Sequence, residues 1–254
     1  IIVHTFGDVE EILSIKKICD ENRVFLIEDF SQCHGGMVDN KLVGTFSDIS
    51  FGSTMGRKSL ISGSQGGLIY TRNLDLYNKI RSISDRGKKV LDIDNLSKNP
   101  AENSVNSLNF SADEFLCAIG SSSLSRLPKI ISQRRKVLDL FSRKIQDLED
   151  SKILKIVQYG KDCSPYVALI QIIDDDLLKN KDYLVKMLSL HNVPINGENN
   201  QIAPLWKWIN TEKQIISQDL LAEAINWRQR HIILFLHEGY RGWYVSRLAD
   251  KIRK

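Results

Sequence analysis

Lys58 lies in a segment rich in glycine and serine, MGRKSLISGSQGG at residues 55–67, directly after Arg57. A lysine in such surroundings can hold a phosphate, bond covalently to a carbonyl-bearing cofactor, or only solvate a turn. The first role would indicate a nucleotide hydrolase and the second an enzyme with an organic cofactor. The third would indicate neither activity. The segments around the lysine decide between them.

A phosphate loop needs a glycine, four residues and then Gly-Lys-Ser or Gly-Lys-Thr, followed by a helix. Gly52, Lys58 and Ser59 have the required separation, but Arg57 occupies the place of the second glycine. The residues that follow, SLISGSQGGLIYT, read as a glycine-rich turn into a strand rather than as a helix. The spacing therefore disfavours a phosphate loop.

A second informative segment is VFLIEDFSQCHGG, at residues 24–36. Its apolar strand ends at Asp29, which puts a carboxylate at the strand edge where open α/β sheets bind ligands. A carboxylate there can pair with the protonated ring nitrogen of a pyridine cofactor. Gln32, three residues on, can donate an amide hydrogen bond nearby. From this segment alone, a helix-capping or turn aspartate is an equally good interpretation.

Composition limits the classes of protein to consider. The 254 residues are 42% hydrophobic and 26% charged, which suits a globular protein of one or two domains. The net charge of +4 is spread among interspersed acids and bases, so nothing indicates nucleic acid as a partner. The four cysteines show neither zinc-site spacing nor a disulfide framework, which predicts a reducing, cytoplasmic compartment and no metal site. No apolar run reaches the ~20 residues that span a bilayer.

The first half of the chain alternates predicted strands and helices. Asp8 with Glu11 predicts the capped start of a helix, and residues 74–83 predict another. Such alternation favours an α/β layer with parallel strands. Strands are predicted at residues 1–5, 24–29, 49–53 and 67–71.

From Ser111 onward the pattern is mainly helical. Ser111 and Glu114 have the spacing of a capping box and predict a helix to residue 127. Pro128 fits the first turn of a second helix, which continues to Leu148. After residue 150 a smaller α/β portion is predicted, with a strand in YVALIQII at 166–173, a helix that includes Leu184 and Leu188, and a last helix that ends the chain. We therefore expect two domains, residues 1–127 and 128–254.

Three segments in this order, VFLIEDFSQCHG, SDISFGSTMGRKSLISGSQGG and NFSADEFLCAIG, resemble the pyridoxal phosphate (PLP)-dependent nucleotide-sugar aminotransferases of the DegT/DnrJ/StrS type. A C-terminal APLWKW stretch also fits. The resemblance implies the PLP-dependent transferase fold type I, which is aspartate-aminotransferase-like. Residues 1–127 would be the C-terminal part of the PLP-binding large domain, and 128–254 a connecting helix and a small α/β domain.

The resemblance also implies the roles of site residues. Lys58 is the catalytic lysine that would form the Schiff base with PLP and then move a proton. Asp29 would pair with the pyridine nitrogen, and Gln32 would lie near the phenolic oxygen of the ring. Ser53 would bind the cofactor phosphate, and Asn109 would reach the phosphate of the cofactor in the neighbouring subunit, which implies a homodimer.

Two further residues are possible substrate-binding groups. Arg57 stands beside the lysine, where its charge is expected to lower the lysine pKa. It is also a hypothetical ligand for a donor carboxylate or a sugar pyrophosphate, with a solvent-facing arginine as the alternative. His34 matches a family position, although a packed or turn histidine is the more ordinary role.

The function implied is transfer of an amino group from glutamate or glutamine to a keto sugar, expected to be nucleotide-linked, for amino-sugar and polysaccharide biosynthesis. Two alternatives remain open. One is a PLP-dependent sugar dehydratase, which Lys58 disfavours because those members carry histidine there. The other is a catalytically incomplete member that acts as an assembly partner. The chain begins with an apolar strand at Ile1, and no glycine-rich phosphate loop or ring-stacking aromatic residue precedes it. We therefore expect an N-terminally truncated large domain.

Overall fold

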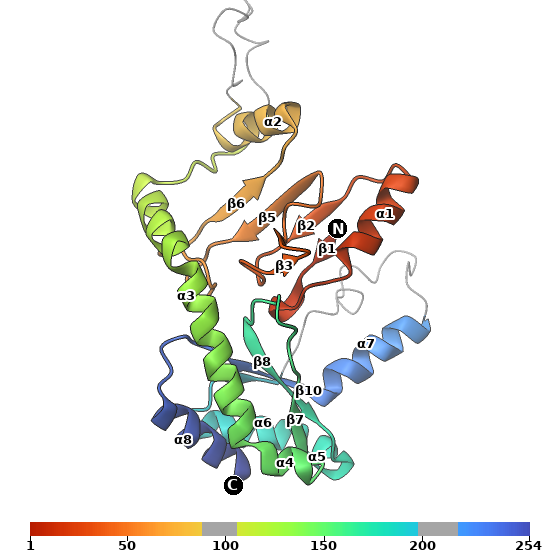
Figure 1. Ribbon diagram of the computed structural model, residues 1–254, viewed down its shortest axis with the longest axis vertical. Helices are drawn as coiled ribbons and strands as arrows, with labels where there is room; N and C mark the ends of the chain where they lie inside the picture. The colour runs from red at the N-terminus through yellow and green to blue at the C-terminus, as the bar shows by residue number, and fades with distance from the viewer. Residues whose placement is uncertain (88–105, 198–217) are drawn as a thin grey trace, which may run out of the picture. The chain divides into compact units, whose positions relative to one another are not determined.

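The computed structural model describes residues 1–87, 106–197 and 218–254, and the chain forms two compact units (Figure 1). The first unit consists of Ile1–Ile131 together with Gly160–Ser164. The second consists of Ser132–Tyr159 and Pro165–Lys254. Each unit is built around a four-stranded sheet.

The sheet of the first unit contains, in spatial order, β1 (Ile2–Val3), β2 (Ile27–Asp29), β5 (Ile49–Ser53) and β6 (Gly67–Tyr70). The first three strands are parallel, as predicted, whereas β6 pairs antiparallel with β5. The prediction of a parallel layer was wrong for β6 because no helix joins it to β5. A chain that turns back without a crossover pairs antiparallel with the strand it left.

Helix α1 (Ile12–Glu21) begins four residues later than the predicted capping aspartate. The carboxylate of Asp8 is used elsewhere, because it accepts hydrogen bonds from the N–H of Val9 (2.9 Å) and the thiol of Cys163 (2.8 Å). A short 3-10 helix, η1 (Thr5–Gly7), occupies the chain between β1 and this aspartate. The prediction that Asp8 starts the helix was therefore wrong.

Two smaller features complete the described part of the first unit. Strands β3 (Met37–Val38) and β4 (Lys41–Leu42) form a hairpin whose two turn residues have φ of 48° and 60°. Positive φ at both positions is the geometry of a tight primed turn, and the Asp-Asn sequence tolerates it. Helix α2 (Leu74–Ser84) is capped by Asn73, whose side chain accepts the N–H of Leu76.

Helix α3 (Glu114–Lys144) is one continuous element with Pro128 inside it. The prediction of two helices was therefore wrong, and so was the Ser111 cap. Asp113 accepts the N–H of Phe115 at 2.7 Å, while the Ser111 hydroxyl lies 3.5 Å from a carboxylate oxygen of Asp85. Proline removes one intrahelical donor but has a helical φ, so a long helix whose following residues are packed, as Val137, Leu138 and Phe141 are here, can retain it.

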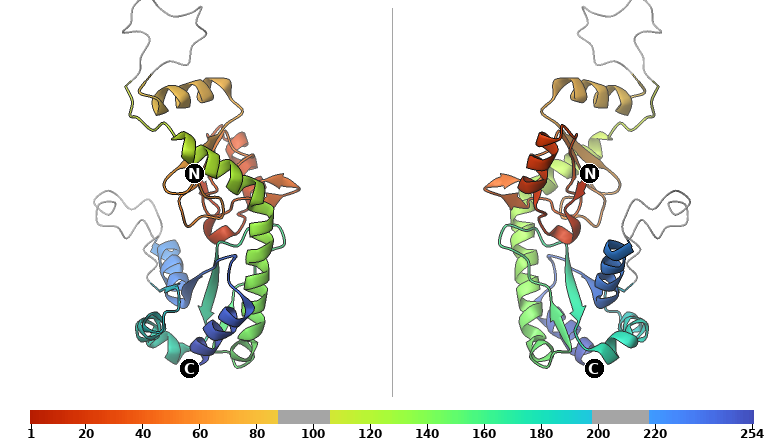
Figure 2. Two further views of the ribbon diagram at one scale, coloured as in Figure 1. Left: turned by 90° about the vertical axis from the view of Figure 1, so that its left-hand side faces the viewer. Right: turned by 90° about the vertical axis from the view of Figure 1, so that its right-hand side faces the viewer.

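The second unit has an antiparallel sheet in the order β7-β8-β10-β9, and the short helix α4 directly precedes β7 in the chain. Figure 2 shows α3 on one side of this sheet and α6 and α7 on the other. The APLWKW stretch at 203–208 lies outside the described residues. None of the described helices is long and apolar enough to cross a membrane. The elements are α4 (Gln146–Asp150), β7 (Leu154–Ile156), β8 (Val167–Ile172), α5 (Asp175–Lys179), α6 (Lys181–Leu190), β9 (Ile195–Asn196), α7 (Gln218–Arg230), β10 (His231–Phe235) and α8 (Gly242–Arg253).

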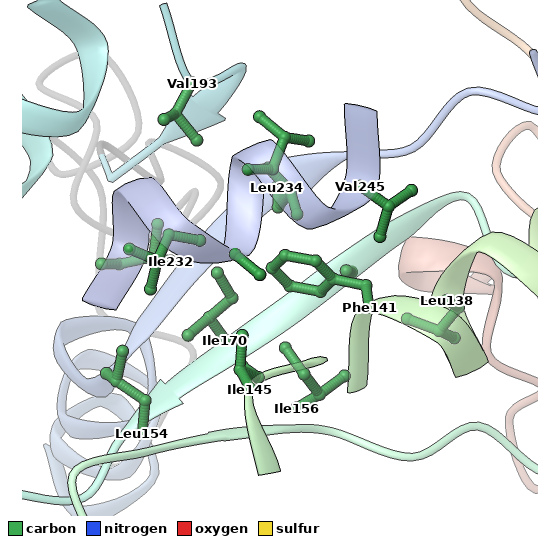
Figure 3. Packing of buried hydrophobic residues seen from close by; sticks show 14 of the residues in the cluster. Leu138, Phe141, Ile145, Leu154, Ile156, Ile170, Val193, Ile232, Leu234 and Val245 are labelled. Carbon is green, nitrogen blue, oxygen red and sulfur yellow. The ribbon is translucent and has the colours of Figure 1, made fainter. Parts of the chain in front are cut away.

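One apolar cluster forms the core of the second unit (Figure 3). It joins Phe141 of α3, Ile170 of β8, Leu234 of β10 and Val245 of α8, each at most 2% exposed. Removing such side chains from water is the main favourable term in folding. We therefore expect the stability of this unit to depend on these contacts.

Leu234→Ala should lower the free energy of unfolding by about 2–5 kcal/mol, because it leaves a cavity in a packed core. Leu190, which is 66% exposed, provides the matched control. Leu190→Ala should change the free energy by no more than about 0.5 kcal/mol. Urea denaturation followed by circular dichroism measures both variants. Equal effects would show that this core has been wrongly assigned.

Candidate active site

Two parallel neighbours, β2 and β5, end side by side and bring two predicted residues to one edge of the sheet (Figure 1). β2 ends at Asp29 and β5 ends at Ser53, and both residues are half-buried. The chain then turns, and Lys58 follows within the same turn. The edge where parallel strands end is the usual ligand site of an open α/β sheet.

Ser31 connects these two strand ends. Its N–H donates to Oδ1 of Asp29 at 2.8 Å, and its hydroxyl oxygen accepts the N–H of Ser53 at 2.9 Å. The Ser53 hydroxyl oxygen in turn accepts the N–H of Met55 at 3.3 Å. Sequence reasoning missed Ser31, although a serine two residues after an aspartate is the pattern of an Asx turn. The second carboxylate oxygen of Asp29 accepts no hydrogen bond within the described residues.

The ring of Phe30 packs closely against two glycines, and this packing keeps the loop after β2 in place. A Cβ atom added to Gly52 would lie 2.3 Å from the Phe30 ring, and one added to Gly44 would lie 2.7 Å from it. Gly44 also has φ of 87°, which other residues rarely adopt. Both positions therefore require glycine so that the Phe30 ring can pack against Gly44 and Gly52 without displacing the loop that carries Asp29 and Ser31.

Burial lowers the pKa of the Lys58 amine, and the negative charge of Asp29 opposes part of that effect. The ammonium and the carboxylate are therefore close enough to interact. Arg57 is exposed and is not among the causes of the shift, so the expectation that it lowers the lysine pKa was wrong. An amine with a lowered pKa is neutral for more of the time at a given pH, which makes it a better nucleophile.

The turn that carries Lys58 is closed by hydrogen bonds across its base. Thr54 donates its N–H to the carbonyl of Gly66 (2.9 Å) and accepts the N–H of Ser62 on its own carbonyl (2.8 Å). The hydroxyl groups of Thr54 and Ser62 lie 2.8 Å apart. The chain passes from this turn directly into β6, so no helix follows the lysine and the phosphate-loop alternative is wrong.

Gln32 lies in the loop that follows β2 and is fixed by its carbonyl end. Its Oε1 accepts the N–H of Phe6 at 2.8 Å, so its Nε2 is the end that can donate to a ligand. Phe6 lies in η1, after β1, which is parallel to β2. Gln32 therefore lies at the same sheet edge as Asp29.

The remaining predicted residues are placed differently. His34 is 2% exposed, and its ring makes an edge contact with Phe30 at 5.6 Å between centroids. Arg57 is exposed on the turn before the lysine, and Asn109 is exposed in a backbone bridge with Asp85. The structure thus brings together Asp29, Ser53 and Lys58, while the cofactor-binding and substrate-binding roles of all the predicted site residues remain predictions.

A buried carboxylate supports the site from inside the sheet. Oε1 of Glu28 accepts the N–H of Gly44 at 2.8 Å, and Oε2 accepts the N–H groups of Phe46 and Ser47, both at 3.0 Å. Burial, the largest single cause, raises the pKa of Glu28, but these hydrogen bonds and the one from His4 together outweigh it and hold the pKa below its usual value.

The His4 ring completes this arrangement. Its Nδ1 accepts the N–H of Glu10 at 3.3 Å, which assigns the proton to Nε2. The Nε2–H then donates to Oε1 of Glu28 at 3.2 Å. Both side chains are fully buried. Sequence reasoning passed over His4 because nothing near it in the sequence indicates its distant partner.

The DegT/DnrJ/EryC1/StrS aminotransferase family model matches residues 1–253 of the chain. GDP-perosamine synthase of Vibrio cholerae is 28% identical over 58% of this chain and 38% of its own length. GDP-perosamine synthase of Escherichia coli O157:H7 is 26% identical over 82% of this chain and 58% of its own length. The matched part of the chain thus spans between about two fifths and three fifths of the length of these relatives.

The fold is similar to that of solved aminotransferases. PseC of Helicobacter pylori, an aminotransferase involved in the biosynthesis of pseudoaminic acid, superposes with a TM-score of 0.82 at 20% identity. That match covers 99% of this chain and 64% of the PseC chain. The comparisons confirm the family and the aminotransferase-like α/β fold predicted from the sequence.

Glu28→Gln should lower the free energy of unfolding at pH 7 by about 1–3 kcal/mol, because the new amide leaves a buried N–H donor without an acceptor. The folded-state pKa of Glu28 is lowered, so its charge stabilises the protein above pH 4.5 and this contribution is lost as the pH falls through the folded pKa. The difference between wild type and variant should therefore shrink on acidification.

Urea denaturation at pH 7 and at several lower values measures this difference. Glu149→Gln, at a half-buried position in α4, is the control and should have little effect at any of these pH values. A difference between wild type and Glu28→Gln that stays constant with pH would show that the Glu28 charge does not support the fold.

Proposed function

Because the chain belongs to the DegT/DnrJ/EryC1/StrS aminotransferase family, we propose that its parent enzyme binds PLP and transfers an amino group to a keto sugar. The donor in this proposal is glutamate or glutamine, and the sugar is nucleotide-linked. A solved structure of similar fold, the GDP-4-keto-6-deoxy-D-mannose-3-dehydratase of Escherichia coli, holds bound hydrated PLP. The relatives named above, both GDP-perosamine synthases, support a nucleotide-linked acceptor.

The observation that carries the proposal is that two parallel strands end at Asp29 and Ser53, with Lys58 in the turn that follows and close enough to Asp29 for their charges to interact. These groups fit PLP, because an amine suits its carbonyl group and a carboxylate suits its ring nitrogen. Oδ2 of Asp29 is available for the ring nitrogen, since Oδ1 is occupied by Ser31. PLP, when bound, supplies a carbonyl group that reacts with amines and a ring that takes up electron density.

Lys58 has two tasks in this proposal. Its amine attaches the cofactor covalently, and once the donor amino acid has displaced it, it takes the proton from the donor α-carbon. Burial favours both tasks because it lowers the lysine pKa and so raises the fraction of neutral amine. The hydrogen-bonded base of the turn, Thr54 with Ser62, keeps the amine at the sheet edge.

Ser53 and Gln32 orient the cofactor. The Ser53 hydroxyl oxygen already accepts the Met55 N–H, so its own proton can be donated to a phosphate oxygen. The Nε2 of Gln32 can donate to the phenolic oxygen, because its Oε1 is held by Phe6. Arg57, exposed beside the lysine, is our proposed ligand for a donor carboxylate or a sugar pyrophosphate.

We extend the proposal to a homodimer in which Asn109 binds the cofactor phosphate of the other subunit. Its neighbours Leu108 and Phe110 are 64% and 65% exposed. Two large apolar side chains beside an exposed asparagine favour a surface that another chain covers.

The test is covalent labelling of the full chain with PLP. Borohydride reduction followed by peptide mass analysis should find a pyridoxyl group on Lys58, and Lys58→Ala should abolish it. Lys181 provides an internal control, because burial also lowers its pKa but its amine donates to the carbonyls of Arg228 and His231.

Labelling of Lys58 without labelling of Lys181 would support a built cofactor site. Equal labelling of both lysines would show only general amine reactivity. Labelling of neither lysine would contradict the proposed cofactor site in this chain and favour a catalytically incomplete member.

A further inference from the structure

The segment Gly160–Ser164 lies between β7 and β8 in the sequence, yet it is part of the first unit. Ser164 is fully buried there and makes two hydrogen bonds. Its N–H donates to the carbonyl of Gly7 at 2.8 Å, and its hydroxyl donates to the carbonyl of His34 at 2.7 Å. One residue thus connects the η1 loop to the loop after β2.

The donor and the acceptor of the hydrogen bond between Phe6 and Gln32 lie in these same two loops. Phe6, the donor, directly precedes Gly7, while Gln32, the acceptor, is two residues before His34. Among the described residues, Nε2 of Gln32 donates to no protein atom. The orientation of this amide therefore depends on the separation of the two loops, which Ser164 sets.

The η1 loop needs such support because its backbone is strained. Phe6 has φ of 62°, a conformation that bulky residues rarely adopt and that costs of order 1–3 kcal/mol. A residue in that region persists only when its surroundings hold it there. Two further hydrogen bonds hold the segment Gly160–Ser164 against the rest of the first unit. Cys163 donates to Asp8 at 2.8 Å, and the Asp162 carbonyl accepts the N–H of Met37 at 2.9 Å.

We propose that Ser164 is a positioning residue that holds the Gln32 amide with its Nε2 directed to the cofactor. The inference rests on the proposed function for its chemical meaning, because Gln32 is the group that would bind the phenolic oxygen. Its structural part, the control of the Phe6–Gln32 hydrogen bond by Ser164, is independent of any cofactor.

The first experiment measures amide hydrogen exchange at Phe6 in the full chain without PLP. Ser164→Ala removes the hydroxyl donor to His34, so exchange at Phe6 should become about two- to tenfold faster, the effect of weakening one hydrogen bond. Ser142→Ala is the matched control. Ser142 is also a buried serine, and its hydroxyl oxygen accepts the side-chain N–H of Gln158 at 3.0 Å in the second unit.

Ser142→Ala should leave exchange at Phe6 unchanged. If Ser164→Ala does not fold, Ser164→Cys keeps the side-chain size with a weaker donor and should increase exchange in the same direction. Wild-type exchange at Phe6 in a folded variant at position 164 would overturn the proposal.

The second experiment measures the Kd of PLP in a double-mutant cycle. Ser164→Ala should raise the Kd about two- to tenfold in the wild-type background and leave it unchanged in a Gln32→Ala background, because the effect acts through Gln32. An equal increase in both backgrounds would overturn the positioning role and indicate a general loss of structure. If PLP does not bind even to the wild type, the proposed function fails, while the exchange experiment still decides the role of Ser164.

Discussion

The first unit depends on one buried carboxylate. Glu28, inside β2, accepts hydrogen bonds from His4 and from three backbone N–H groups of the chain that leads into β5. Neighbouring residues on a strand point to opposite faces. Anchoring Glu28 inside therefore puts Asp29 on the opposite face, at the end of the strand. A shift of β2 by one residue would remove both the anchor and the site carboxylate.

The site is assembled from this anchor by short links. Asp29 is joined through Ser31 to Ser53, and Ser53 to the turn that carries Lys58. Each link uses a backbone N–H and a side-chain oxygen, so each adds little free energy but fixes one direction. Together they hold an amine and a carboxylate close to each other while both remain half-buried. Burial of the amine lowers the lysine pKa, and the neighbouring carboxylate opposes part of that effect.

The features that follow local patterns could be predicted from the sequence. The strands that end at Asp29 and Ser53, and their parallel pairing, follow from apolar runs between polar turns. The failures came from distant partners. Asp8 has the spacing of a helix cap, but Cys163, 155 residues away, accounts for one of its hydrogen bonds. Ser164 was missed for the same reason, because no periodicity or motif reports a contact made across the chain.

The position of Gly160–Ser164 also has a consequence for synthesis on the ribosome. Domains generally fold in order as the chain emerges, from the N-terminus onward. Here the strands of the first unit emerge early, but the carbonyls of Gly7 and His34 receive their donors only when Ser164 follows. In the nascent first unit these two carbonyls therefore lack their Ser164 donors until β7 of the second unit has also been made.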